Sequence, residues 1–204
     1  MTGKHNVLFI LVSLFVIGAL LTGCQPKKMT DEFFGLRLNE QYSQIDAIDI
    51  LRSNTGKSFD VKEDIPLLLV GHNIDFAGYL WELVYFEFDY TNHLYQVSFE
   101  KYFYSFGERV DSPSFKQAET EANVCYDTLM NMLKGKYGKA TTDNSHPEFY
   151  TGSMRWQFGK KQFLDIYLSS VNYNNLDKNG WIPQFGVIIN YTDDRARSSA
   201  SDML

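Results

Sequence analysis

Two stretches in the middle of the chain alternate between apolar and polar side chains, and this pattern limits the folds that the chain can adopt. Residues 79–89 read YLWELVYFEFD, and residues 94–104 read LYQVSFEKYFY. Alternation with a period of two is typical of a strand with one buried face. Thr91 and Asn92 supply a turn between the two runs. Two alternating runs joined by a short polar loop predict an antiparallel hairpin.

Further strands are expected on both sides of this hairpin. The chain has 16 Phe, 13 Tyr and 3 Trp, and aromatic residues favour strands. Residues 154–158 and 163–171 predict a second hairpin around Gly159-Lys160-Lys161, and residues 185–191 predict the last strand. Residues 33–38 and 67–70 predict short strands, with a turn at Gly71-His72-Asn73 after the latter.

Two helices are expected, one ahead of each group of strands. Ser43 is a suitable N-cap, with Asp46 near the helix N-terminus, and Asn54-Thr55-Gly56 ends the first helix. Residues 112–137 predict the longer helix, which begins at Pro113 and ends before Gly138. It has one apolar stripe at spacings of three and four: Phe115, Ala118, Ala122, Cys125, Leu129 and Leu133.

The order of these elements predicts an α+β domain. Each half of the chain has one helix followed by about three strands that can pair as hairpins. We therefore expect an antiparallel sheet with the helices on one face, built from two helix-then-three-strand halves. The halves show no close sequence repeat.

The N-terminus has the order of a secretory signal. Lys4 and His5 precede the apolar run of residues 7–21, and Leu21-Thr22-Gly23 precedes Cys24. This segment resembles the lipobox of bacterial lipoprotein signal peptides. The resemblance implies cleavage before Cys24, diacylglycerol on its sulfur and a fatty acyl chain such as palmitate on its new amine. The alternative, an uncleaved membrane-spanning helix, needs about 20 apolar residues, and this run is shorter.

The lipobox sets the expected division of the chain. Residues 1–23 are a signal peptide, 24–32 a lipidated tether, 33–192 a single domain and 193–204 a flexible tail. Gln25, in place of Asp, implies by the same resemblance that the anchor is in the outer membrane of the cell envelope. The chain has 19 basic and 25 acidic residues. Removal of residues 1–23 takes away one basic residue, Lys4, and no acidic one, so the mature chain has a net charge of −7. A mildly acidic chain is a poor candidate for binding nucleic acid.

The globular part resembles a group of uncharacterised bacterial envelope lipoproteins. The motifs that carry this resemblance are residues 34–38 (FGLRL), the aromatic hairpin, residues 133–139 (LKGKYGK) and the Trp156 hairpin, with Ala140 where the group usually has Pro. The predicted topology is also similar to outer-membrane assembly lipoproteins and to β-lactamase inhibitor proteins. None of these motifs is catalytic, so the resemblance implies no active site.

Residues with catalytic or metal-binding chemistry are few in the sequence. Acylation of Cys24 leaves only Cys125, so an internal disulfide cannot form, and a thiol on the apolar stripe is expected to be buried and inert. Three histidines stand apart from one another near predicted turns: His72, His93 and His146. Four carboxylates are expected on a solvated hairpin: Glu82, Glu87, Asp89 and Glu100. The loop at 172–180 has only one carboxylate, Asp177, which is too few for a calcium site. Neither a Gly-x-Ser-x-Gly elbow nor a phosphate-binding loop is present. We therefore expect a protein without catalytic activity, metal or cofactor.

One face of the first hairpin is the best candidate for binding. If Val84, Phe86 and Phe88 face the core, the alternate residues lie on the opposite face of the hairpin, where aromatic side chains are mixed with polar ones. These aromatic residues are Tyr79, Trp81, Tyr85, Tyr102 and Tyr104. Tyr and Trp give a large contact area with a polar end, which suits a protein partner. The same rings could stack on a glycan. The alternative is that this face is covered by another layer, by the N-terminal segment or by a loop.

Overall fold

The computed structural model describes residues 28–64, 66–104, 113–142, 150–170 and 183–197. These residues form an α+β fold, which confirms the predicted class. The helices are α2 (Gln44–Thr55) and α3 (Pro113–Tyr137). The strands are β1 (Glu32–Phe33), β2 (Leu36–Arg37), β3 (Phe59–Asp64), β4 (Leu67–Phe76), β5 (Tyr79–Phe88), β6 (Leu94–Tyr104), β7 (Thr141–Thr142), β8 (Tyr150–Gly159), β9 (Gln162–Ser170) and β10 (Pro183–Asp193).

The main sheet has eight antiparallel strands in the order β3-β4-β5-β6-β10-β9-β8-β7, while β1 and β2 form a separate small hairpin. The strand order reverses where β6 meets β10, so the last strands of the two halves join in the middle of the sheet. Each half has four strands after its helix, because β3 and the short β7 add to the three that were expected. The sequence of β3, FDVKED, carries the charges that are typical of an edge strand.

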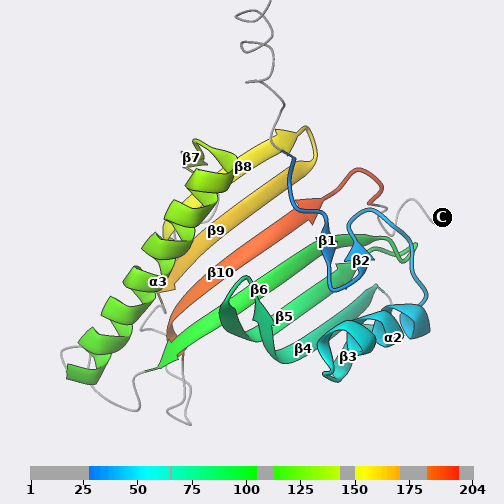
Figure 1. The fold of residues 1–204 in the computed structure, drawn as a ribbon, viewed down its shortest axis with the longest axis horizontal. Coiled ribbons are helices and arrows are strands. Elements are labelled where there is room, and N and C mark those ends of the chain that lie inside the picture. Colours follow the sequence, from blue (N-terminus) through cyan, green and yellow to red (C-terminus); the bar gives the residue numbers. More distant parts are fainter. Residues whose placement is uncertain (1–27, 65, 105–112, 143–149, 171–182, 198–204) are drawn as a thin grey trace, which may run out of the picture.

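Both helices lie on one face of the sheet, as predicted (Figure 1). The helix α3 packs on β6, β9 and β10, and α2 contacts β2, β3 and β4. The N-cap Ser43 accepts a hydrogen bond from the Asp46 amide, and Gly56 ends α2 with φ of 67°. The predicted stripe of α3 is buried, including Cys125, and burial raises the pKa of that thiol.

The turn predicted at residues 71–73 is wrong, because β4 continues through it to Phe76. Gly71 lies in the strand beneath the ring of Phe59, and a Cβ at this position would come within 2.5 Å of that ring. The chain instead reverses at Ala77 and Gly78, whose φ angles of 53° and 80° are those of a two-residue hairpin turn.

The packed part of the chain extends beyond both expected boundaries. In the predicted tether, Met29 is buried and Thr30 bonds to the hydroxyl of Tyr137 on α3. At the other end, Asp193 belongs to β10 instead of a tail, is 1% exposed and pairs with Arg195. Residues 1–27, which include Cys24, and residues 198–204 lie outside the described ranges.

Candidate functional site

The five aromatic residues predicted to share one hairpin face lie on two faces. Trp81 is 1% exposed and is part of the core on the helix side, where its Nε1 donates to the Phe76 carbonyl oxygen at 3.1 Å. The hydroxyl of Tyr79 lies 4.0 Å from the sulfur of Met132 on α3. Only Tyr85, Tyr102 and Tyr104 remain on the face away from the helices, so the assignment of Tyr79 and Trp81 to that face is wrong.

An irregularity in the β4–β5 pairing explains this error. Trp81 and Val84 are both buried although they are three residues apart, so the in-and-out alternation inverts between them. At the same level of β4, Asn73 has φ of 53°, in the left-handed region, and lies between the paired residues His72 and Ile74. The register of the two strands is the same on both sides of Asn73, so the departure is in the backbone and not an inserted residue. A side-chain parity of two holds only for regular strands, and Trp81 accordingly lies on the core face.

We call Tyr85, Glu100, Tyr102 and Tyr104 the tyrosine cluster; it lies on β5 and β6. The hydroxyl of Tyr102 donates a hydrogen bond to Glu100, and the rings of Tyr102 and Tyr104 are 6.3 Å apart. Burial raises the pKa of Glu100, and the nearby carboxylate of Glu87 adds to the shift. Burial and the Glu100 carboxylate together raise the pKa of Tyr102. Tyr104 is 45% exposed, which puts it at the rim of the cluster.

A second polar group continues along the same face. Glu87 accepts hydrogen bonds from the Tyr95 hydroxyl at 2.8 Å and from the Gln96 amide at 2.6 Å. The Thr192 hydroxyl of β10 donates to Gln96 at 3.1 Å. The alternation places Tyr95 on the core face, but a register shift between Glu87 and Phe88 inserts an extra residue on β6, which brings the Tyr95 hydroxyl to Glu87.

Asn190 in β10 is a residue of this face that sequence reasoning missed. Its Oδ1 is buried and has no hydrogen-bond partner among the described residues. It pairs in register with Ser98 on one side and with Asp165 on the other, and Asp165 holds Arg155 at 2.7 and 2.9 Å. The signal was an Asn in the apolar segment VIINY. A buried acceptor without a donor is rare and costs stability.

The sheet face that carries the tyrosine cluster is partly covered, as the alternative interpretation of the sequence expected. The guanidinium of Arg197, just after β10, lies 4.0 Å from the centre of the Tyr95 ring. Ser98 and Thr192 are buried, whereas Tyr85 and Tyr102 are half-buried. Neither described helix and neither strand of the β1–β2 hairpin lies on this face, since all of them pack on the opposite one.

The residues considered for metal binding or catalysis are held in local structural contacts. Asp89 accepts from the Thr91 and His93 amides and so fixes the turn between β5 and β6. His72 lies 3.4 Å from Asp60 across the edge of the sheet. Among the described residues, no group of three or more His, Cys, Asp or Glu side chains is placed to hold a metal ion. His146 and the 172–180 loop, with Asp177, lie outside the described residues.

Comparison with protein-family models, with curated proteins and with solved structures finds no match to this chain. Neither helix of the described ranges combines the length and the apolar character that a membrane span requires.

Proposed function

We propose that the protein is a non-enzymatic bacterial lipoprotein, anchored through Cys24 in the outer membrane, that binds a protein partner as a scaffold, inhibitor or assembly factor. The tyrosine cluster is the observation that supports this proposal. It presents half-buried and exposed rings on a face that neither described helix covers. Rings with polar ends surrounded by hydrogen-bonding groups suit a protein interface.

The Glu100 carboxylate on this face favours a partner with donor groups. Burial makes ionisation of Glu100 costly, and a cation or hydrogen-bond donor from a partner would offset that cost. The chain is acidic overall, with a net charge of −6 before any cleavage, so a partner with Lys or Arg at its contact surface is expected.

Photo-cross-linking tests the protein partner directly. A photoreactive residue at position 104 should yield a defined cross-linked product in envelope preparations, and the combined Tyr102→Ala and Glu100→Ala changes should remove it. The matched control places the same photoreactive residue at Ile45, which is 73% exposed on α2, on the opposite face. Equal products from both positions, or a product that survives the double substitution, would remove this face from consideration.

A glycan is the second candidate partner. The adjacent rings of Tyr102 and Tyr104, flanked by Glu100, supply both a stacking surface and hydrogen-bonding groups for a sugar. Titration with a panel of envelope oligosaccharides by calorimetry separates the two candidates. Binding that the Tyr104→Ala variant loses would favour the glycan, and the absence of heat across the panel would leave the protein partner.

The anchor needs its own test, because Cys24 lies outside the described residues. We expect the mature chain to begin at Cys24 and to carry acyl groups, which mass spectrometry of the N-terminal peptide measures. The Cys24→Ser variant should carry no acyl groups. An unmodified N-terminal peptide would contradict the lipidation.

A further inference from the structure

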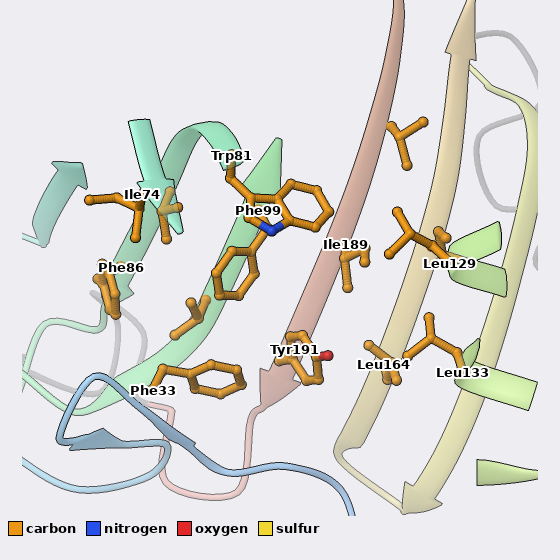
Figure 2. Packing of buried hydrophobic residues seen from close by; sticks show 14 of the residues in the cluster. Phe33, Ile74, Trp81, Phe86, Phe99, Leu129, Leu133, Leu164, Ile189 and Tyr191 are labelled. Carbon is orange, nitrogen blue, oxygen red and sulfur yellow. The ribbon is translucent and has the colours of Figure 1, made fainter. Parts of the chain in front are cut away.

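A cavity of about 590 Å³ lies on the helix side of the sheet, between α3 and an aromatic wall. Phe76, Trp81 and Phe99 form the wall: the rings of Phe76 and Phe99 stack at 4.4 Å, and Trp81 meets Phe99 edge-on at 5.5 Å. Figure 2 shows Trp81 and Phe99 on one side of Ile189 and Tyr191, and Leu129 and Leu133 on the other. Protein interiors are close-packed, with few voids larger than a water molecule, whereas ligand sites occupy about 300–1,000 Å³.

The α3 side of the cavity changes from apolar to cationic along the helix. Leu129 and Leu133 supply its apolar part, and Met132, which is 49% exposed, lies beside them. Lys136 follows one turn later and also lines the cavity, with an exposed side chain. Residues 132 and 136 are on the same helix face, so they flank the opening of the cavity toward solvent.

The cationic end is also rich in hydroxyl groups. The Lys136 ammonium donates to the Thr30 hydroxyl at 2.9 Å, and that hydroxyl lies 2.8 Å from the hydroxyl of Tyr137. Within the described part of the chain, no carboxylate forms an ion pair with Lys136. The cation and its neighbouring donors are therefore available to an anion.

Tyr191 is a second group that points to a ligand. Its side chain is 6% exposed and lines the cavity, yet its hydroxyl forms no hydrogen bond with another described residue. Burial raises the pKa of Tyr191, so the phenol stays neutral and can donate a hydrogen bond. Buried polar groups are normally paired, and a ligand oxygen would satisfy this one.

We propose that the cavity binds the acyl chain of a single-chain amphiphile whose anionic head group pairs with Lys136. The aromatic and leucine walls match a hydrocarbon chain, and the Lys136, Thr30 and Tyr191 donors match a carboxylate or phosphate. A free fatty acid and a lysophospholipid share this chemistry. The proposal rests on the cavity alone and does not depend on the tyrosine cluster, which lies on the other face of the sheet.

The chain-length dependence follows from the apolar wall. Each methylene that leaves water for an apolar site contributes a factor of about four in affinity. Saturated fatty acids of increasing length should therefore bind with stepwise higher affinity until the cavity is full. The head group contributes separately: loss of a charge-assisted hydrogen bond should weaken anion binding about tenfold.

Calorimetric titration of the mature chain with Cys24→Ser, which contains all described residues, tests this proposal. The probes are laurate, palmitate, a lysophosphatidate and the neutral dodecanol, which matches laurate in chain length, each kept below its solubility limit and micelle concentration. We expect one site per chain, tighter binding of palmitate than of laurate, and a weakening of about tenfold by Lys136→Met for the anions alone. Tighter binding of palmitate would identify a free fatty acid as the ligand, and tighter binding of the lysophosphatidate would identify a lysophospholipid.

Two variants separate the cavity from the surface of α3. Lys134→Met removes a neighbouring charge that does not line the cavity, and it should leave all affinities unchanged. Met132→Trp places a large ring at the partly exposed opening, and it should block every probe while the circular dichroism spectrum stays native. Absence of saturable binding by any chain, or equal weakening by Lys134→Met and Lys136→Met, would overturn the proposal.

Discussion

Replacement of Trp81 by Ala tests the least expected feature of the fold, the inversion of alternation in β5. If regular alternation held, Trp81 would share the helix-free face with Tyr85, and its loss would cost little. In the structure Trp81 is 1% exposed, meets Phe99 edge-on, and donates from Nε1 to the Phe76 carbonyl oxygen. The substitution therefore removes a buried side chain, an aromatic pair and a hydrogen bond together.

The expected cost of this substitution is large. Truncation of a buried Trp to Ala typically destabilises a protein by about 3–5 kcal/mol, a range that already includes lost contacts such as the aromatic pair. The Phe76 carbonyl oxygen, left without its donor, adds about 1 kcal/mol. The side of the indole that faces the cavity has fewer contacts to lose, so we expect about 4 kcal/mol for Trp81→Ala. For a chain of this size, that corresponds to a fall in melting temperature of about 10 °C.

Urea unfolding followed by far-ultraviolet circular dichroism measures this loss without relying on tryptophan fluorescence. Trp81→Phe keeps an aromatic ring and should recover about half of the lost stability. Tyr85→Ala is the matched control on the same strand and should cost about 1 kcal/mol, because Tyr85 is half-buried on the other face. A cost below about 1 kcal/mol for Trp81→Ala, or equal costs for Trp81→Ala and Tyr85→Ala, would refute the inverted alternation.

Three further substitutions test other parts of the fold. Gly71→Ala should destabilise the protein by about 1–3 kcal/mol in urea unfolding, because its Cβ would lie 2.5 Å from the Phe59 ring. Ser43→Ala should cost about 1 kcal/mol, since it removes the acceptor of the Asp46 amide at the start of α2. Glu100→Gln should flatten the pH dependence of stability: with its folded pKa raised above the usual 4.5, Glu100 causes stability to fall as pH rises from about 4.5 through that pKa.

Each of these substitutions has a matched control in the same chain. Gly135→Ala on α3 meets nothing within 4 Å and should stabilise the helix by about 0.5–1 kcal/mol, so equal losses from the two glycine changes would contradict the steric argument. Ser43→Asp keeps a capping oxygen and should retain most of the stability. Glu119→Gln removes an exposed carboxylate from α3 and is the control for Glu100→Gln. If the two variants show the same dependence of stability on pH, burial does not raise the pKa of Glu100.

Much of the fold could be predicted because its signals are local. The cap at Ser43, the apolar stripe of α3 and the alternation on β6 beyond Tyr95 each require only a few neighbouring residues, and the structure confirms them. The errors occur where a distant contact decides. Gly71 resembles a turn residue until the ring of Phe59, from the neighbouring strand, is seen to occupy the space of a side chain. A local pattern cannot contain that information.

The candidate site was only half predictable for the same reason. At Tyr102 and Tyr104 the alternation of β6 itself is kept, because the one register shift nearby inserts its extra residue on β10, so their parity gave the correct face. Trp81 and Tyr95 lie beside irregularities, and there the parity gave the wrong face. Trp81 pairs with Ile74, which follows the irregular Asn73, and Tyr95 lies at the β5–β6 register shift. Irregular pairing depends on how two strands meet, which a single run of sequence does not encode.

The position of the cavity follows from how the two halves of the chain meet. The helix α3 is held to its own half at both ends, by Phe115 against Phe185 and by Tyr137 against Phe158. The aromatic wall belongs to the other half and is braced by Phe33 of the β1–β2 hairpin, 5.9 Å from Phe99. Movement of α3 into this space would break the ring contacts that hold it at both ends. A ligand with a flexible chain would fill this space without a change in either half, which is why occupancy should raise the melting temperature while the circular dichroism spectrum stays the same.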